Sequence, residues 1–234
     1  MVICTLDGSV SPRNLLQSIS RSCPVLTRLQ LDYRQYHFNE TQFNDGAVNF
    51  DDLRSILACT SMTYLHVMVL LALNLSDSDV LDMAQAWPRL RSLELGSCNH
   101  TTENAKHLSL SSLFILTRHC PDIKCITLDI NAGVSEGFLA ETGTGRVARL
   151  DSLNVGHYIP ESDGEAFLAR LLGQICEPQC RLNYLENRRL TDKSHEELRS
   201  RWENVKMLIR HFSELYSTIR SLELENASLR ALAR

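Results

Sequence analysis

The sequence predicts an α/β fold in which helix–strand units stack side by side, followed by a long C-terminal helix. Three observations predict it: a spaced apolar pattern that recurs five times, a helical stripe before four of these patterns, and a final segment with seven-residue apolar spacing. We therefore expect two parts, a repeat array at 1–185 and a C-terminal helix at 186–234.

The recurring pattern is apolar-x-x-apolar-x-apolar, and its central residues lie 36, 28, 33 and 27 positions apart. The five sets are Leu26, Leu29, Leu31; Met62, Leu65, Val67; Leu90, Leu93, Leu95; Ile123, Ile126, Leu128; and Leu150, Leu153, Val155. Because side chains alternate between the two faces of a strand, each set predicts a short strand with one buried face.

Helical spacing precedes the first four sets. The apolar residues of these segments are Leu15, Leu16, Ile19 and Cys23; Leu53, Ile56 and Leu57; Val80, Leu81, Met83 and Ala84; and Leu113, Leu116 and Cys120. Pro24, Pro88 and Pro121 follow three of them, where proline cannot continue a helix. We expect N-caps in "SDSD" around Asp77 and Asp79, and in "SLSS" around Ser111.

A unit of this size cannot bury its apolar face alone, whereas stacked units form a continuous core. We therefore expect a leucine-rich-repeat solenoid of about five to six repeats, with a parallel concave sheet and convex helices. The units "LLQSISRSCPVLTRLQL", "DVLDMAQAWPRLRSLEL" and "SLFILTRHCPDIKCITL" resemble the cysteine-containing type of this repeat.

From Leu15 to Phe212, with a late "GEAFLARLLGQI" helix and a Trp-bearing C-terminal helix, the layout resembles the repeat region of F-box proteins expanded in basidiomycete fungi. The resemblance implies a protein-interaction module, like the substrate-recognition part of an F-box subunit of a cullin-type ubiquitin ligase. No F-box precedes the first repeat, so we expect a ligase adaptor as partner only if an F-box is supplied elsewhere, and the chain would then be a fragment.

Composition excludes several classes of function. The net charge of −4, from 24 basic and 28 acidic residues, gives no basic surface for nucleic acid or an acidic membrane. The longest apolar run, Tyr64 to Leu75, is too short to span a bilayer. No secretory signal is apparent, so we expect a cytoplasmic or nuclear protein whose eight cysteines stay reduced.

Three segments suggest chemistry at first sight. The first contains His119, Cys120 and Cys125, but the second pair of ligands that zinc needs is missing. We expect Cys120 under a helix end and Cys125 on the outward face of the sheet. The Glu-Pro between Cys176 and Cys180 indicates a turn. "GTGRVA", Gly143 to Ala148, precedes a strand rather than following one, and indicates a loop. We expect no enzyme, metal or cofactor.

The residues between the apolar strand positions should form one outward, concave surface. They are Arg28, Gln30, Asp32; Tyr64, His66, Met68; Ser92, Glu94, Gly96; Cys125, Thr127, Asp129; and Ser152, Asn154, Gly156. We expect a protein or peptide target there, with Arg28, Tyr64 and His66 as anchors. The predicted contact residues are Arg28, Gln30, Tyr64, His66, Met68, Glu94, Cys125, Thr127, Asp129 and Asn154.

The C-terminal segment begins with a predicted capping box, Ser194 and Glu197. Its heptad positions are Val205, Leu208, Phe212, Leu215, Ile219, Leu222, Asn226, Leu229 and Ala233. A single polar residue such as Asn226 fixes register in a parallel two-stranded coiled coil. We expect the part to Phe212 to pack on the last repeat and the part beyond to pair in a homodimer through Leu215, Ile219, Leu222, Asn226 and Leu229. A structural dimerisation scaffold is thus the alternative function.

Overall fold

The computed structural model describes residues 1–6, 11–33, 48–69, 73–97, 108–132, 147–156, 160, 164–184 and 192–232. Its centre is a seven-stranded parallel sheet, so the predicted α/β class is confirmed. The strands are β1 (Val2–Leu6), β2 (Arg28–Tyr33), β4 (Tyr64–Val69), β6 (Ser92–Ser97), β8 (Cys125–Leu128), β10 (Leu150–Asn154) and β11 (Cys176–Asn183). They are ordered β1-β2-β4-β6-β8-β10-β11, so each pairs with the next sheet strand along the chain.

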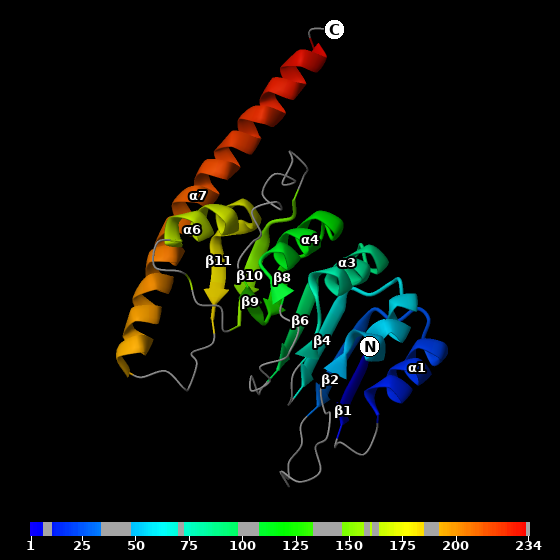
Figure 1. Ribbon diagram of the computed structural model, residues 1–234. Helices are drawn as coiled ribbons and strands as arrows, with labels where there is room; N and C mark the ends of the chain where they lie inside the picture. The colour runs from blue at the N-terminus through cyan, green and yellow to red at the C-terminus, as the bar shows by residue number, and fades with distance from the viewer. Residues whose placement is uncertain are drawn as a thin grey trace.

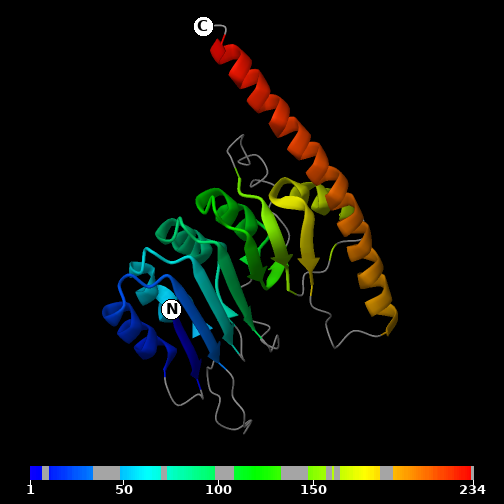
Figure 2. The same cartoon turned by 180° about the vertical axis from the view of Figure 1, so that it is seen from behind.

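The helices between the strands lie on one side of the sheet (Figure 1). They are α1 (Pro12–Ser22), α2 (Phe50–Leu53) continued by the 3-10 helix η2 (Arg54–Ala58), α3 (Asp77–Ala86), α4 (Ser111–His119) and α6 (Glu165–Ile175). Two small parallel ladders join β3 (Val48–Asn49) to β5 (Leu73–Asn74), and β7 (Leu108–Ser109) to β9 (Ile130–Ala132). The opposite face of the sheet is uncovered by these helices, as the reverse view shows (Figure 2).

The core between sheet and helices consists of the residues of the apolar pattern. The strand register aligns the central residues in one buried row: Leu29, Leu65, Leu93, Ile126, Leu153 and Leu182. A second buried row contains Leu31, Val67, Leu95 and Leu128. Equivalent positions of successive units therefore stack on one another, as the spacing predicts.

The same turn follows four of the helical segments. At Cys23, Cys59, Trp87 and Cys120 the helix-end carbonyl accepts a hydrogen bond from the backbone N–H three residues later. Two of these cysteines also link neighbouring units, because the Cys59 thiol donates to the Cys23 carbonyl (3.6 Å) and the Cys120 thiol to the Trp87 carbonyl (3.5 Å). A small buried thiol is thus a structural donor at this position.

The cap predicted in "SDSD" is confirmed for α3, whereas the cap predicted around Ser111 needs correction. The N-cap of α3 is Ser76, which exchanges hydrogen bonds with Asp79. Asp77 instead accepts from the backbone N–H (3.0 Å) and hydroxyl (2.6 Å) of Ser109, in the next unit. Ser111 is the first residue of α4 and not its cap. The spacing of residues within one unit could not predict this bridge from Asp77 to the next unit.

The sheet has two more strands than the five apolar sets predict. β1 lies before the first set and pairs with β2. β11 begins directly after α6, and the turn predicted between Cys176 and Cys180 was wrong because these residues belong to this strand. The Pro-containing segment forms an irregularity within β11 instead of ending the strand.

The last helix, α7 (Asp192–Leu232), begins two residues before the predicted cap at Ser194. Its first half packs on α6 and β11, with Leu198, Trp202, Val205 and Ile209 buried in the common core. Its second half extends beyond the sheet and the other helices (Figure 1; Figure 2). Among the described residues no helix is both long and apolar enough to cross a membrane.

Candidate partner-binding face

The sheet face turned away from the helices, here called the open face, carries the predicted outward residues in register. One row contains Arg28, Tyr64, Ser92, Cys125 and Ser152, and the next contains Gln30, His66, Glu94, Thr127 and Asn154. These rows alternate with the buried apolar rows, because neighbouring residues of a strand point to opposite faces. The predicted composite surface is therefore present in the structure.

His66 lies at the centre of a polar network on this face. Its Nδ1 is 2.9 Å from Glu94 Oε2 on β6, and its Nε2 is 3.2 Å from Asp32 Oδ1 on β2. A neutral imidazole donates through one nitrogen only, whereas an imidazolium donates through both. The ring therefore bridges the carboxylates of the strands on either side, with one nitrogen towards each.

Further hydrogen bonds hold the two carboxylates. Gln30 Nε2 donates to Asp32 Oδ2 (2.9 Å), and Ser92 Oγ donates to Glu94 Oε1 (3.4 Å). The Asp32 side chain is buried. A buried carboxylate needs such partners. The network therefore fixes the side chains of β2, β4 and β6 before any partner arrives.

Arg28 and Tyr64 form the next part of the face. The Arg28 guanidinium lies 5.1 Å from the Tyr64 ring centroid, and the Tyr64 and His66 rings are stacked at 6.5 Å. Burial, and then the charge of Glu94, raise the pKa of Tyr64, so its hydroxyl stays protonated and able to donate. Arg28, Gln30 and Tyr64 line a pocket of about 160 Å³ together with β1.

The far end of the face is less polar. Met68 fits beside Gly96, where an added Cβ would lie 3.0 Å from the Met68 sulfur. Cys125 is half-buried, and burial raises the pKa of its thiol. Asn154 Oδ1 accepts from the backbone N–H of Gly156 (3.0 Å), whose φ of +62° suits glycine. Apart from Asp129, the predicted contact residues at this end are uncharged.

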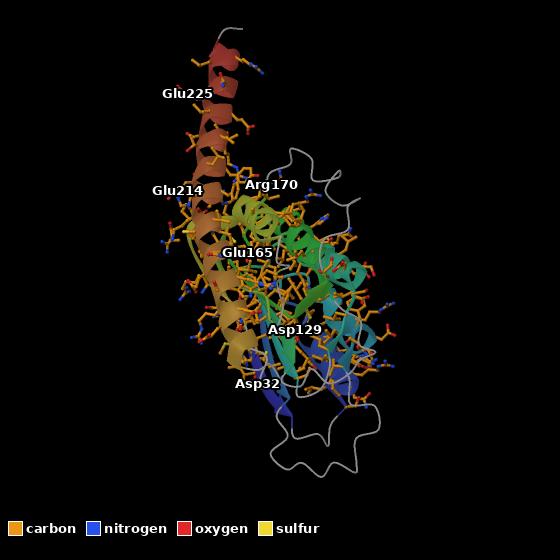
Figure 3. All side chains as sticks on the ribbon, turned by 60° about the vertical axis from the view of Figure 1, so that its left-hand side comes forward. Asp32, Asp129, Glu165, Arg170, Glu214 and Glu225 are labelled. Atoms are coloured by element: carbon orange, nitrogen blue, oxygen red, sulfur yellow. The ribbon has the colours of Figure 1, made fainter. Side chains whose placement is uncertain are left out.

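The ten predicted contact residues follow the strand pattern with one difference. Nine lie in β2, β4, β6, β8 and β10, whereas Asp129 lies just after β8, against Gly156. Asp32 and Asp129 both lie on the sheet, far from Glu225 on α7 (Figure 3). Asp32 was an outward position but was not among the predicted contacts. Its diagonal approach to His66 follows from the register, which the repeat spacing already indicates.

Two of the other candidate groups, Cys120 with Cys125 and the "GTGRVA" segment, form no site in the described residues. Cys120 is fully buried at the end of α4 and Cys125 is on the open face, as predicted. Most of the "GTGRVA" loop lies outside the described residues; Val147 and Ala148 come directly before β10. In the described ranges no three His, Cys, Asp or Glu side chains are grouped as metal ligands.

The chain matches no protein-family model and no curated protein sequence.

Proposed function

We propose that the chain is a leucine-rich-repeat solenoid whose open face is the concave face and binds a protein or peptide target. In this proposal it acts in the cytoplasm or nucleus as the substrate-recognition part of an F-box subunit does, without catalysis of its own. The repeated turns, the stacked apolar rows and the one-sided helices all support a solenoid.

The observation that carries the proposal is the pre-ordered network of Arg28, Tyr64, His66 and Glu94 across neighbouring strands. Tyrosine and arginine supply much of the binding energy in protein interfaces. Because these side chains already hold one another in place, they lose little conformational entropy when a partner binds. The uncovered face presents them together.

Affinity capture with quantitative mass spectrometry tests this function. The experiment compares the full chain, a variant with alanine at Arg28, Tyr64 and His66, and a matched control with alanine at three exposed helix positions, Arg21, Gln85 and Phe167. We expect a protein that the wild type and the control recover and that the open-face variant loses. Equal recovery by all three would contradict the proposal. Recovery of ligase adaptors with the target would place the chain in a ubiquitin ligase.

A second candidate function, a dimerisation scaffold, is favoured by the second half of α7. Leu215, Ile219, Leu222 and Leu229 are between 41% and 57% exposed there, and Asn226 lies in the same heptad frame. An apolar seam on a projecting helix is typical of a coiled coil. The partner would be a second copy, since Glu225 and Arg230 occupy complementary flanking positions.

Sedimentation of two single variants tests this candidate. Leu222 lies on the seam, whereas Leu224 is more exposed but points to the opposite side of the heptad. We expect a dimer for the wild type and for Leu224→Glu, and a monomer for Leu222→Glu. A monomeric wild type would exclude the scaffold.

A further inference from the structure

An irregularity in β11 brings two cysteines to one place. Leu150 of β10 pairs with Cys176 and Ser152 pairs with Arg181, so four residues of β11 lie opposite the single residue Asp151. A regular strand would carry positions 176 and 180 far apart. The extra residues, which include Pro178, bulge out of the ladder and return Cys180 towards Cys176.

The two thiols lie close to each other, since both side chains line one pocket. Cys176 is fully buried and Cys180 is half-buried, and hydrogen bonding between the thiols shifts the pKa of each. Both side chains line a pocket of about 330 Å³ between β11 and α7, together with Lys206 and Arg210. The pair is therefore reachable by a small molecule, although one sulfur has no contact with bulk solvent.

A half-buried cation, Arg149, is linked to the backbone of Cys176 through Ser213. The Arg149 guanidinium is held beneath α7, where Nη2 donates to the Ser213 hydroxyl and to the Ser213 carbonyl (3.4 Å), while Ser213 Oγ donates to the Cys176 carbonyl (2.6 Å). Arg149 Nε is buried without a hydrogen-bond partner. Its charge is thus only partly compensated, and it favours a thiolate nearby.

The two cysteines differ in acidity. The hydrogen bond from Cys176 lowers the pKa of Cys180, and Arg149 lowers it further against the opposing effects of burial, Asp151 and Glu177. The same hydrogen bond and complete burial raise the pKa of Cys176. By contrast, burial raises the pKa of Cys59, Cys120 and Cys125. Cys180 is also the more exposed of the two sulfurs, so it is the one that a small molecule in the pocket reaches first.

We propose that Cys176 and Cys180 form a reversible redox site, in which a hydroperoxide entering the pocket between β11 and α7 converts the two thiols to a disulfide. This site is independent of the open face. A disulfide that forms within a chain kept in a reducing compartment is transient, which is typical of a redox sensor and not of a structural cross-link.

The chemistry balances with hydrogen peroxide as oxidant. The Cys180 thiolate attacks one peroxide oxygen; the S–O bond forms, the O–O bond breaks, and the leaving hydroxide takes a proton to become water. The Cys176 thiol then loses its proton and attacks the Cys180 sulfur; the S–S bond forms and the S–O bond breaks, releasing the second water. Two thiols lose two electrons in total, and peroxide gains them.

Peptide mass spectrometry of the full chain tests the proposal directly. Trypsin cleaves after Arg170 and Arg181, so both cysteines lie in the single peptide LLGQICEPQCR, which contains no other cysteine. After mild treatment of the reduced chain with hydrogen peroxide, we expect this peptide to lose the mass of two hydrogen atoms, and dithiothreitol to restore it. The Cys120 peptide is the internal control and stays unmodified, because that thiol is fully buried.

Two variants assign the roles. Cys176→Ser should accumulate a sulfenic acid at Cys180 that dimedone traps, whereas Cys180→Ser should leave Cys176 unmodified at the same dose. The proposal is overturned if the wild-type peptide keeps its mass, if it oxidises no faster than the Cys120 peptide, or if dithiothreitol does not reverse the change. Because the main readout uses the wild-type chain, the proposal stays falsifiable even where a variant fails to fold.

Discussion

Several single residues stabilise the fold through contacts with a neighbouring unit. Cys120 is buried as predicted, and its thiol donates to the preceding unit. Asp77 and Asp32 form bonds between units that spacing along one strand or helix does not reveal. The burial of a residue was thus predictable from its place in the repeat, whereas a partner in a neighbouring unit required the register.

Cys120 predicts a pH dependence of stability. Burial raises the pKa of its thiol from 9.0 to about 12, so the folded chain holds the proton longer than the unfolded chain. This contribution is complete below pH 9 and is lost as the pH rises towards 12. The advantage of wild type over Cys120→Ala in the free energy of unfolding should therefore shrink between about pH 8.5 and 11. A constant difference, measured by urea unfolding at each pH, would refute it.

His66 predicts a coupled set of substitutions. His66→Ala leaves Asp32 and Glu94 without their shared partner, and we expect the free energy of unfolding to fall by about 1–3 kcal/mol. The loss should be smaller in a background with Asp32→Asn and Glu94→Gln, where no charge is left uncompensated. Urea unfolding of the four chains measures the coupling. Strictly additive losses would contradict the network.

At the scale of elements, local patterns predicted most helices and the five inner strands. The helical stripe near Leu53 became two short segments, and β11 was missed because Glu-Pro usually indicates a turn. The packing of the first half of α7 on the last helix–strand unit was predicted and is present, but the close approach of α7 to α6 could not be predicted from either helix alone. It depends on Gly173, where an added Cβ would lie 2.6 Å from Phe212 Cβ.

Gly173→Ala tests how closely these helices pack. In an isolated helix this substitution stabilises by about 1 kcal/mol, because alanine is the better helix former. Here the overpacking against Phe212 should reverse the sign and cost about 1–3 kcal/mol. Thermal unfolding gives the sign directly. A stabilised variant would show that α7 does not lie against α6 as described.

At the scale of the whole molecule, one continuous core runs from α1 to the first half of α7. Trp202 is fully buried in this core and stacks on Tyr184 with ring centroids 5.2 Å apart. The repeat spacing predicted the order of the stack. It could not tell whether α7 unfolds cooperatively with the other elements, because each unit in a stack of repeats contacts only its neighbours.

Trp202→Ala measures that cooperativity. The chain has two tryptophans, so the variant retains Trp87, which is buried between α3 and the sheet, as the sole tryptophan probe. Truncating the ring should cost about 3–5 kcal/mol. If α7 and the repeats unfold together, the unfolding transition reported by Trp87 moves to a lower urea concentration. The shift should be smaller in Trp202→Phe, which also retains Trp87 as the sole tryptophan. An unshifted Trp87 transition would mean that α7 unfolds separately.

The position of the open face was predictable from the sequence, whereas its binding specificity was not. Alternation and spacing placed Arg28, His66 and Thr127 on one face, because the strand geometry requires it. The identity of a partner depends on how these side chains complement another surface, and a repeat pattern holds no information about that surface.

Site-specific photo-crosslinking in cells tests directly whether the open face binds a partner protein. A photoreactive amino acid replaces either Thr127 on the open face or Phe167, which is exposed on α6 on the opposite side. We expect crosslinks to a different protein from position 127 and none from position 167. We also expect the crosslinks from position 127 to disappear when Arg28, Tyr64 and His66 are replaced by alanine. Crosslinks to another protein from position 167 alone, or to a second copy alone from both positions, would contradict it.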